Sequence, residues 1–451
     1  MLVSLLAAVT VLVLSFSYSK LRYIRFHQYA HFPQHPTSLV LGHLKVFGDF
    51  VKRNKPNAHA DLAIVAMNRA LGRPPIMFID MRPISDPMGE EWKLLRKRFN
   101  PGFAPQYLAT FVPQILDKGL TFLERLDSLS KTDDTFSLMN LTTRLTFDVI
   151  GKVIMETDLD AQHNDQAKKG ELVDLFETLL DAYNGERLNL PWWLNIRKVR
   201  RRAALSNRIT SLLQAIVRRK HAELHEKGED AINARSVLSR GLQDITTLTP
   251  SIADEMYDQL RTFLFAGHDT TSILLSWVFY ELSRTPHAIR AVRAELNGLL
   301  GPDASPAAVR ARLVEREDLV QQMPYVSAVI KETLRLHPPG GTARVIPPGS
   351  GFTVRMPSGQ QQCLDGLLVY NCQSIIHTDP EVFGDTADDF VPERWLADDD
   401  SDAVASEAIP VGAWRPFERG PRNCIGQELA NIEARVIIAL AARRYDFIKV
   451  A

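Results

Sequence analysis

One cysteine in this chain has neighbours that suit chemistry rather than packing. Cys424 lies in a ten-residue segment that also holds Phe417, Gly420, Arg422 and Gly426. The pattern after it predicts a helix, and the free N–H groups at a helix start favour a thiolate over a thiol. Such a thiolate is a good axial ligand for haem iron, because its electron density favours O–O cleavage. The glycines would let backbone approach a flat macrocycle, and Arg422 could pair with a propionate.

A second segment places polar residues where a helix interior normally excludes them. Ala266 to Thr271 lies midway along a helix predicted over about 251–284, and it holds Gly267, Asp269 and Thr270. Thr and Asp side chains compete for backbone hydrogen bonds, and glycine loosens a helix. Such local inconsistency often marks a functional site. Taken alone, each segment also has a structural explanation, either a buried cysteine at a helix start or a satisfied polar pair in a buried helix.

Together the two segments resemble the signatures of the haem-thiolate monooxygenases, the cytochrome P450 family. The first matches F-x-x-G-x-R-x-C-x-G at all its fixed positions, and the second matches A-G-x-D/E-T-T/S. The resemblance implies haem b as the cofactor, with Cys424 as the axial ligand of its iron. It also implies that Thr270 hydrogen-bonds the iron-bound dioxygen and that Asp269 helps to deliver protons. The runs 89–105 and 336–345 look most like microsomal enzymes of fungal secondary metabolism.

Three further residues have structural roles by the same resemblance. Glu332 and Arg335 are three residues apart on one helix face, which by itself indicates only a surface ion pair. In the family, the corresponding pair and a second arginine, here Arg394, form a buried triad that fixes the haem-binding loop.

Residues that resemble haem propionate ligands lie far from the cysteine in the sequence. Trp92 and Arg96 match W-x-x-x-R, and one helical turn separates them, so both could face the same carboxylate. Arg344 matches a further propionate-binding arginine of the family.

The elements that must position these residues are mainly helical. Apolar residues recur three and four apart over long stretches, and prolines at 286 and 338 close two of the predicted helices. Short β-like runs lie at 75–79, 351–356 and 366–370. The sequence therefore predicts a mainly α fold with a smaller β portion, which is also the fold of the family that it resembles. The predicted helices are 106–126, 141–155, 171–183, about 251–284, about 325–336 and about 426–443.

The amino terminus predicts a membrane anchor. Residues 1–19 carry no charged side chain, and the basic Lys20, Arg22 and Arg25 follow at once. About 20 apolar residues can cross a bilayer, and a basic cluster on the carboxyl side keeps the rest of the chain in the cytosol. No basic region precedes the apolar stretch, which argues against a cleaved signal peptide. We expect a single-pass anchor in the endoplasmic reticulum membrane at 1–19, a basic, Pro-containing connector at 20–43 and a monooxygenase domain at 44–451.

The composition excludes several other classes of protein. Of the 451 residues, 45% are apolar and 24% charged, which is typical of globular chains and not of disordered ones. The 53 basic and 53 acidic residues balance, which argues against a nucleic-acid partner. Three cysteines, at 363, 372 and 424, are too few and too far apart for a disulfide framework or a Cys-rich zinc site.

The function expected from these features is insertion of one atom of dioxygen into an apolar small molecule. The sequence has no nucleotide-binding glycine fingerprint, so the family implies electrons from NADPH through a partner reductase. Two pieces usual in the family are missing: several tens of residues between Ile79 and Trp92, and a β-hairpin after the last helix. A truncated or mis-spliced pseudo-enzyme therefore stays open. A haem-thiolate isomerase or dehydratase also stays open, although Asp269 and Thr270 argue against it.

Overall fold

The computed structural model describes residues 2–39, 42–53, 60–74, 76–79, 90–132, 134–163, 169–184, 195–226, 236–396 and 409–449. The chain forms two compact units. The larger unit comprises Gly89–Pro339, Asp388–Gly412 and Phe417–Ala451, and the smaller one Met1–Met88, Gly340–Ala387 and Ala413–Pro416. The assignment of 44–451 to a single catalytic domain stays a prediction.

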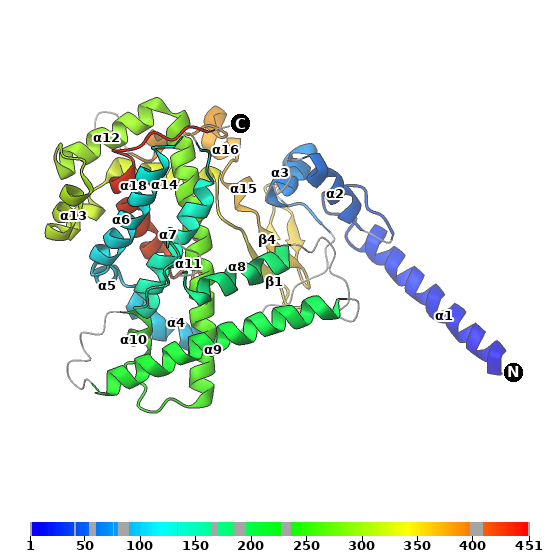
Figure 1. Ribbon diagram of the computed structural model, residues 1–451. Coiled ribbons are helices and arrows are strands. Elements are labelled where there is room, and N and C mark those ends of the chain that lie inside the picture. Colours follow the sequence, from blue (N-terminus) through cyan, green and yellow to red (C-terminus); the bar gives the residue numbers. More distant parts are fainter. Residues whose placement is uncertain are drawn as a thin grey trace. The chain divides into compact units, whose positions relative to one another are not determined.

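Within its described residues, the larger unit is built of helices (Figure 1). Serine or threonine side chains cap the starts of several of them, and proline occupies the first turn of others, where its missing N–H is not needed. In chain order they are α4 (Glu90–Phe99), η2 (Asn100–Phe103), α5 (Pro105–Ala109), α6 (Val112–Leu129), α7 (Leu138–Met155), α8 (Glu171–Asn184), α9 (Ile196–Glu226), α10 (Val237–Leu242), α11 (Pro250–Arg284), α12 (Pro286–Leu300), α13 (Pro306–Glu315), η6 (Glu317–Gln321), α14 (Pro324–Leu336), η8 (Pro392–Trp395) and α18 (Gln427–Ala441).

Helix α11 is the central element of the larger unit and packs against α7, α9, α14 and α18. Its most extensive packing is against α7, and Gly267 lies in this contact. A Cβ atom at this position would lie 2.5 Å from Cδ1 and 2.8 Å from Cγ1 of Ile150, so a larger residue would force the Ile150 side chain to shift. Thr146 of α7 also donates its hydroxyl to the His268 carbonyl at 2.7 Å. Gly267 thus serves the packing of two helices, and α11 remains continuous through it.

The smaller unit combines helices with short antiparallel strands. Strand β1 pairs with β4, with Thr342 opposite Asn371, and β2 pairs with β3, with Thr353 opposite Cys363. Tyr370 donates its hydroxyl to the buried Asp61 of α3 at 2.9 Å, which joins helix and strand. The elements are α1 (Leu2–Tyr23), the π-helix η1 (Ile24–Gln28), α2 (Leu44–Arg53), α3 (Ala60–Ala70), β1 (Thr342–Val345), β2 (Thr353–Arg355), β3 (Gln361–Cys363), β4 (Leu368–Asn371), α15 (Gln373–Ile376), α16 (Pro380–Phe383) and η7 (Gly384–Thr386).

The predicted fold class, mainly α with a smaller β portion, is confirmed. The helices expected over 141–155, 171–183, 251–284, 325–336 and 426–443 are present within a few residues of their predicted bounds. The stretch 106–126 instead divides into α5 and α6. The strand expected at 75–79 is wrong where it is described, because residues 76–79 form no ladder. The expected gap between Ile79 and Trp92 falls almost wholly outside the described residues.

The amino-terminal helix is confirmed, but its predicted role as a membrane span is not. Helix α1 continues past residue 19 to Tyr23, and the π-helix η1 follows it from Ile24 to Gln28. Among the residues that the structure describes, no helix has both the length and the apolar composition to cross a membrane.

One carboxylic acid in the larger unit is buried without full hydrogen bonding. Glu433 of α18 is only 2% exposed, and its Oε1 has no hydrogen-bond partner. Burial raises its pKa well above the ordinary value for glutamate. The folded protein therefore holds this side chain as the neutral acid under conditions in which the unfolded chain releases the proton.

This difference predicts a pH-dependent loss of stability. Above the ordinary glutamate pKa, and up to the raised one, the folded state binds one more proton than the unfolded state, so each pH unit removes about 1.4 kcal/mol. Glu433→Gln should remove this loss. Its melting temperature, relative to the wild type, should rise more at pH 8 than at pH 5 in calorimetric scans. The exposed Glu124→Gln is the control, and equal gains at both pH values would contradict the assignment.

Candidate functional site

The segment before α18 forms a tight loop around Cys424. The Cys424 N–H donates to the Phe417 carbonyl at 2.8 Å, and the Asn423 N–H donates to the Gly420 carbonyl at 3.1 Å. Gly420 has φ +79°, and Glu418 adopts the left-handed region at +55° without being glycine. Gly420 therefore permits the turn that returns the chain to the cysteine. Phe417 contributes its carbonyl to this loop.

The Cys424 thiol lies at the start of α18, where the predicted helix-start environment is present. Burial raises its pKa, while hydrogen bonds from the backbone of Gly426 and Gln427 and the positive charge of Arg96 oppose this rise. The side chain nevertheless has solvent-exposed surface. The free sulfur is thus a thiol at neutral pH, and its surroundings would support the negative charge once a metal removed the proton.

The loop offers open space beside the sulfur. A Cβ atom added at Gly420 would meet no atom within 4 Å, and one added at Gly426 would meet only Cys424 Sγ, at 3.9 Å. A single sulfur donor, supporting N–H groups and bare backbone fit a flat metal complex that brings most of its own ligands. The residues that the structure describes here therefore fit haem.

Arg96 of α4 contacts the cysteine loop directly. Its guanidinium donates to the backbone oxygen of Asn423 at 2.7 Å and to Oδ1 of the same residue at 2.9 Å. Burial lowers the pKa of Arg96, and the neighbouring Cys424 opposes this change. Asn423 was not among the predicted site residues, although its position beside Cys424 was the available signal. The Trp92 side chain lies outside the described residues, while the backbone of that position belongs to α4.

Two other predicted haem contacts have different settings. Arg344 belongs to strand β1 of the smaller unit, where its guanidinium donates to the Ala343 carbonyl at 2.7 Å. Arg422 is half-buried within the cysteine loop. The role of each toward a propionate stays a prediction.

The polar segment of α11 presents two contrasting faces. Thr270 is exposed and Asp269 partly exposed, and the Thr270 hydroxyl donates to the Ala266 carbonyl at 2.6 Å. On the opposite side, His268 is buried, stacks on Phe147 at 3.8 Å and donates from Nδ1 to the Leu264 carbonyl. Burial lowers the pKa of His268, which favours the neutral ring. The helix thus holds one face firmly and leaves the Asp269–Thr270 face accessible.

The residues predicted to form a structural triad meet at the carboxylate of Glu332. It is completely buried, as is Arg335, which donates to both carboxylate oxygens at 2.8 and 2.9 Å. Arg394 adds a hydrogen bond at 3.0 Å. The structure also brings two donors that sequence reasoning missed, the Val391 N–H at 2.9 Å and the Trp395 indole N–H at 2.8 Å. Trp395 could have been suspected because it directly follows Arg394.

Comparisons with known proteins agree with these motifs. The family model described as Cytochrome P450 matches residues 80–450. The cytochrome P450 monooxygenase acrF of Aspergillus aculeatus is 32% identical over 377 residues, which cover 79% of this chain and 72% of that protein. The cytochrome P450 monooxygenase polC of Polytolypa hystricis is 30% identical over 365 residues, covering 79% of this chain and 63% of that protein. A bifunctional cytochrome P450/NADPH–P450 reductase of Gibberella moniliformis is 28% identical over 328 residues, or 70% of this chain and 26% of that protein.

Removing the charge of Glu332 should destabilise the larger unit strongly. In Glu332→Gln the buried Arg335 loses its counter-charge, which typically costs about 3–5 kcal/mol. The matched control is Glu315→Gln, since Glu315 forms an exposed pair with Arg312 at the same three-residue spacing, and such pairs contribute about 0–1 kcal/mol. Urea unfolding of both variants measures the difference. Similar losses of unfolding free energy in the two variants would show that burial does not determine how strongly the Glu332–Arg335 pair stabilises the fold.

Proposed function

Because the chain belongs to the cytochrome P450 monooxygenase family, we propose that it inserts one atom of dioxygen into an apolar small molecule. The observation that carries the proposal is the Cys424 loop, in which backbone N–H groups and Arg96 surround one accessible sulfur. The resemblance of two sequence runs to microsomal fungal enzymes supports a substrate from secondary metabolism.

Haem b is the proposed cofactor, and when bound it supplies the iron at which dioxygen is held and activated. Cys424 is the proposed axial ligand, and the Gly426 and Gln427 backbone bonds would stabilise its negative charge. Arg96 is well placed to keep the loop in position through its two hydrogen bonds to Asn423. Trp92, Arg344 and Arg422 remain proposed propionate contacts.

Protons would be handled by the accessible face of α11. The Thr270 hydroxyl hydrogen bonds to the Ala266 carbonyl and can turn from this acceptor to donate its proton to a ligand beside the helix. The neighbouring Asp269 carboxylate would take up a proton from water and pass it on, through a water molecule, to restore the proton on Thr270 Oγ1. Groups that transfer protons in this way typically contribute about 10²–10⁴-fold to a rate.

Electrons would come from NADPH through a separate reductase. The support is that one similar protein, the bifunctional enzyme of Gibberella moniliformis, carries the two activities on one chain. For the location, we propose attachment to the cytosolic face of the endoplasmic reticulum membrane. Apolar side chains on α1 support this, because Val11, Leu12 and Phe16 are each at least 64% exposed.

The haem assignment predicts a spectroscopic signature that depends on one cysteine. The reduced protein with carbon monoxide should show the red-shifted Soret band of a thiolate-ligated haem, and Cys424→Ala should abolish it. Cys363→Ser, which changes another exposed cysteine, should leave the band intact. The band should appear in the membrane fraction of expressing cells. Absence of the band from the wild type would refute the Cys424 ligand, and its presence only in the soluble fraction would refute the location.

Use of dioxygen predicts that Thr270 governs how efficiently electrons yield product. Thr270→Val keeps the side-chain shape but removes the hydroxyl, so product formed per NADPH consumed should fall about 10-fold or more, with an unchanged carbon monoxide spectrum. Thr262→Val is a matched control in the same helix, because Thr262 also donates to a carbonyl four residues earlier, at 2.8 Å. Full turnover by Thr270→Val would instead favour an isomerase or dehydratase that needs no dioxygen.

A further inference from the structure

Three atoms that can donate lone pairs converge at the end of α9. His221 and His225 are one turn apart on this helix, and their Nε2 atoms lie 3.0 Å from each other. The backbone oxygen of Ile245, three residues after α10, lies 3.0 Å from His221 Nε2 and 3.1 Å from His225 Nε2. The three contacts form a nearly equilateral triangle within the larger unit.

Hydrogen bonds cannot satisfy all three sides of this triangle. A carbonyl oxygen only accepts, and each Nε2 either donates one proton or accepts one. If both nitrogens carry protons, two donors face each other at 3.0 Å. If either nitrogen lacks its proton, its lone pair faces those of the Ile245 oxygen. At least one side is therefore repulsive in every protonation state.

A divalent metal ion satisfies all three atoms at once. The centre of a triangle with sides of 3.0, 3.0 and 3.1 Å lies about 1.8 Å from each corner. An ion about 1 Å out of that plane would be about 2.0–2.1 Å from both nitrogens, which is the usual Zn–N distance. Two histidines four residues apart on one helix face are also a recurrent zinc-binding arrangement.

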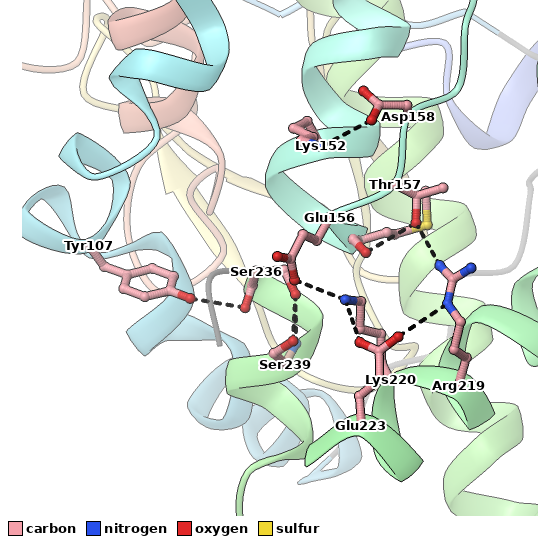
Figure 2. Close-up of polar contacts among 11 residues, drawn as sticks. Tyr107, Lys152, Glu156, Thr157, Asp158, Arg219, Lys220, Glu223, Ser236 and Ser239 are labelled. Atoms are coloured by element: carbon pink, nitrogen blue, oxygen red, sulfur yellow. Dashed lines mark hydrogen bonds and ion pairs between the residues drawn. The ribbon is translucent and has the colours of Figure 1, made fainter. Parts of the chain in front are cut away.

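The helix turn next to this triangle is held in place, as Figure 2 shows for Lys220 and its surroundings. The nearly buried Lys220 ammonium bonds Glu156 and Glu223, both at 2.8 Å. Desolvation lowers the pKa of Lys220, but these two carboxylates outweigh it and the net pKa is raised. Arg219 adds a hydrogen bond to Thr157 at 3.2 Å. The turn of α9 that carries the two imidazoles is therefore already fixed to the end of α7 before any ion binds.

We propose that His221, His225 and the Ile245 carbonyl bind a zinc or similar divalent transition-metal ion. His225 is exposed and His221 half-buried, so water can reach the ion and complete its coordination. Neutral imidazole suits zinc, nickel and copper rather than magnesium or calcium. The ion would join the carboxyl end of α9 to the segment after α10, and this site is independent of the proposed haem chemistry.

The test is calorimetric titration of the haem-loaded full chain with zinc chloride. The wild type should bind one equivalent at this site, and His225→Gln should weaken that binding at least about 10-fold, since even outer-shell changes at metal sites cost 10–100-fold. His225 is exposed, so its replacement should not disturb folding. The control is His287→Gln, an exposed histidine that lies elsewhere in the larger unit, and it should bind zinc like the wild type.

A second measurement separates this site from zinc bound at other surface groups. Excess zinc should raise the melting temperature of the wild type and of His287→Gln, because an ion that binds only the folded state stabilises it. The same excess should raise that of His225→Gln and His221→Gln much less. Equal affinity of the wild type and His225→Gln would overturn the proposal, and so would an equal thermal shift in all four proteins.

Discussion

The buried carboxylate of Glu332 is the constraint on which the arrangement of the larger unit depends. A charge removed from water is tolerated only when hydrogen-bond donors surround it, and Glu332 accepts from Arg335, Arg394, Trp395 and the Val391 N–H. The chain leaves the larger unit after Pro339 and rejoins it at Asp388. Val391 and Arg394, which follow the point of return by a few residues, both bind this carboxylate. The return of the chain to the larger unit is thus held by one side chain that takes no part in the proposed chemistry.

A second constraint acts on α11, where one helical turn holds both the residues that pack against α7 and the residues of the proposed chemistry. Gly267 admits Ile150, and Thr146 donates to the His268 carbonyl, so the inner side of the turn is fixed against α7. The outer side keeps Asp269 and Thr270 accessible. A site that transfers protons requires rigid support behind its accessible polar face, because small displacements of the reacting side chains lower the reaction rate. The glycine expected to loosen the helix instead allows Ile150 of α7 to pack directly against it.

Much of this could be predicted from the sequence, since it depends on local pattern. Prolines, capping residues and apolar spacing set the bounds of α7, α11, α14 and α18, and the motif around Cys424 indicated a loop before a helix. What escaped prediction depends on distant partners. Adjacency to Arg394 and to Cys424 marked Trp395 and Asn423 as candidates, but the distant side chain that each would contact could not be read locally. The lack of a partner strand for residues 76–79 could not be read locally either. The gathering of His221 and His225 with Ile245 likewise requires knowing where the chain returns after α10.

Glu156, which ends α7, shows how two requirements meet in one residue. Its backbone lies in the left-handed region at φ +54° and caps the helix, a place where glycine is the unstrained choice. Glycine, however, would leave the buried ammonium of Lys220 without one of its two carboxylates. An unstrained backbone would therefore favour glycine at this position, whereas compensation of the Lys220 charge requires an acidic side chain. A substitution that only relaxed the backbone would leave the Lys220 ammonium with Glu223 as its single carboxylate partner, so few substitutions can improve this helix end.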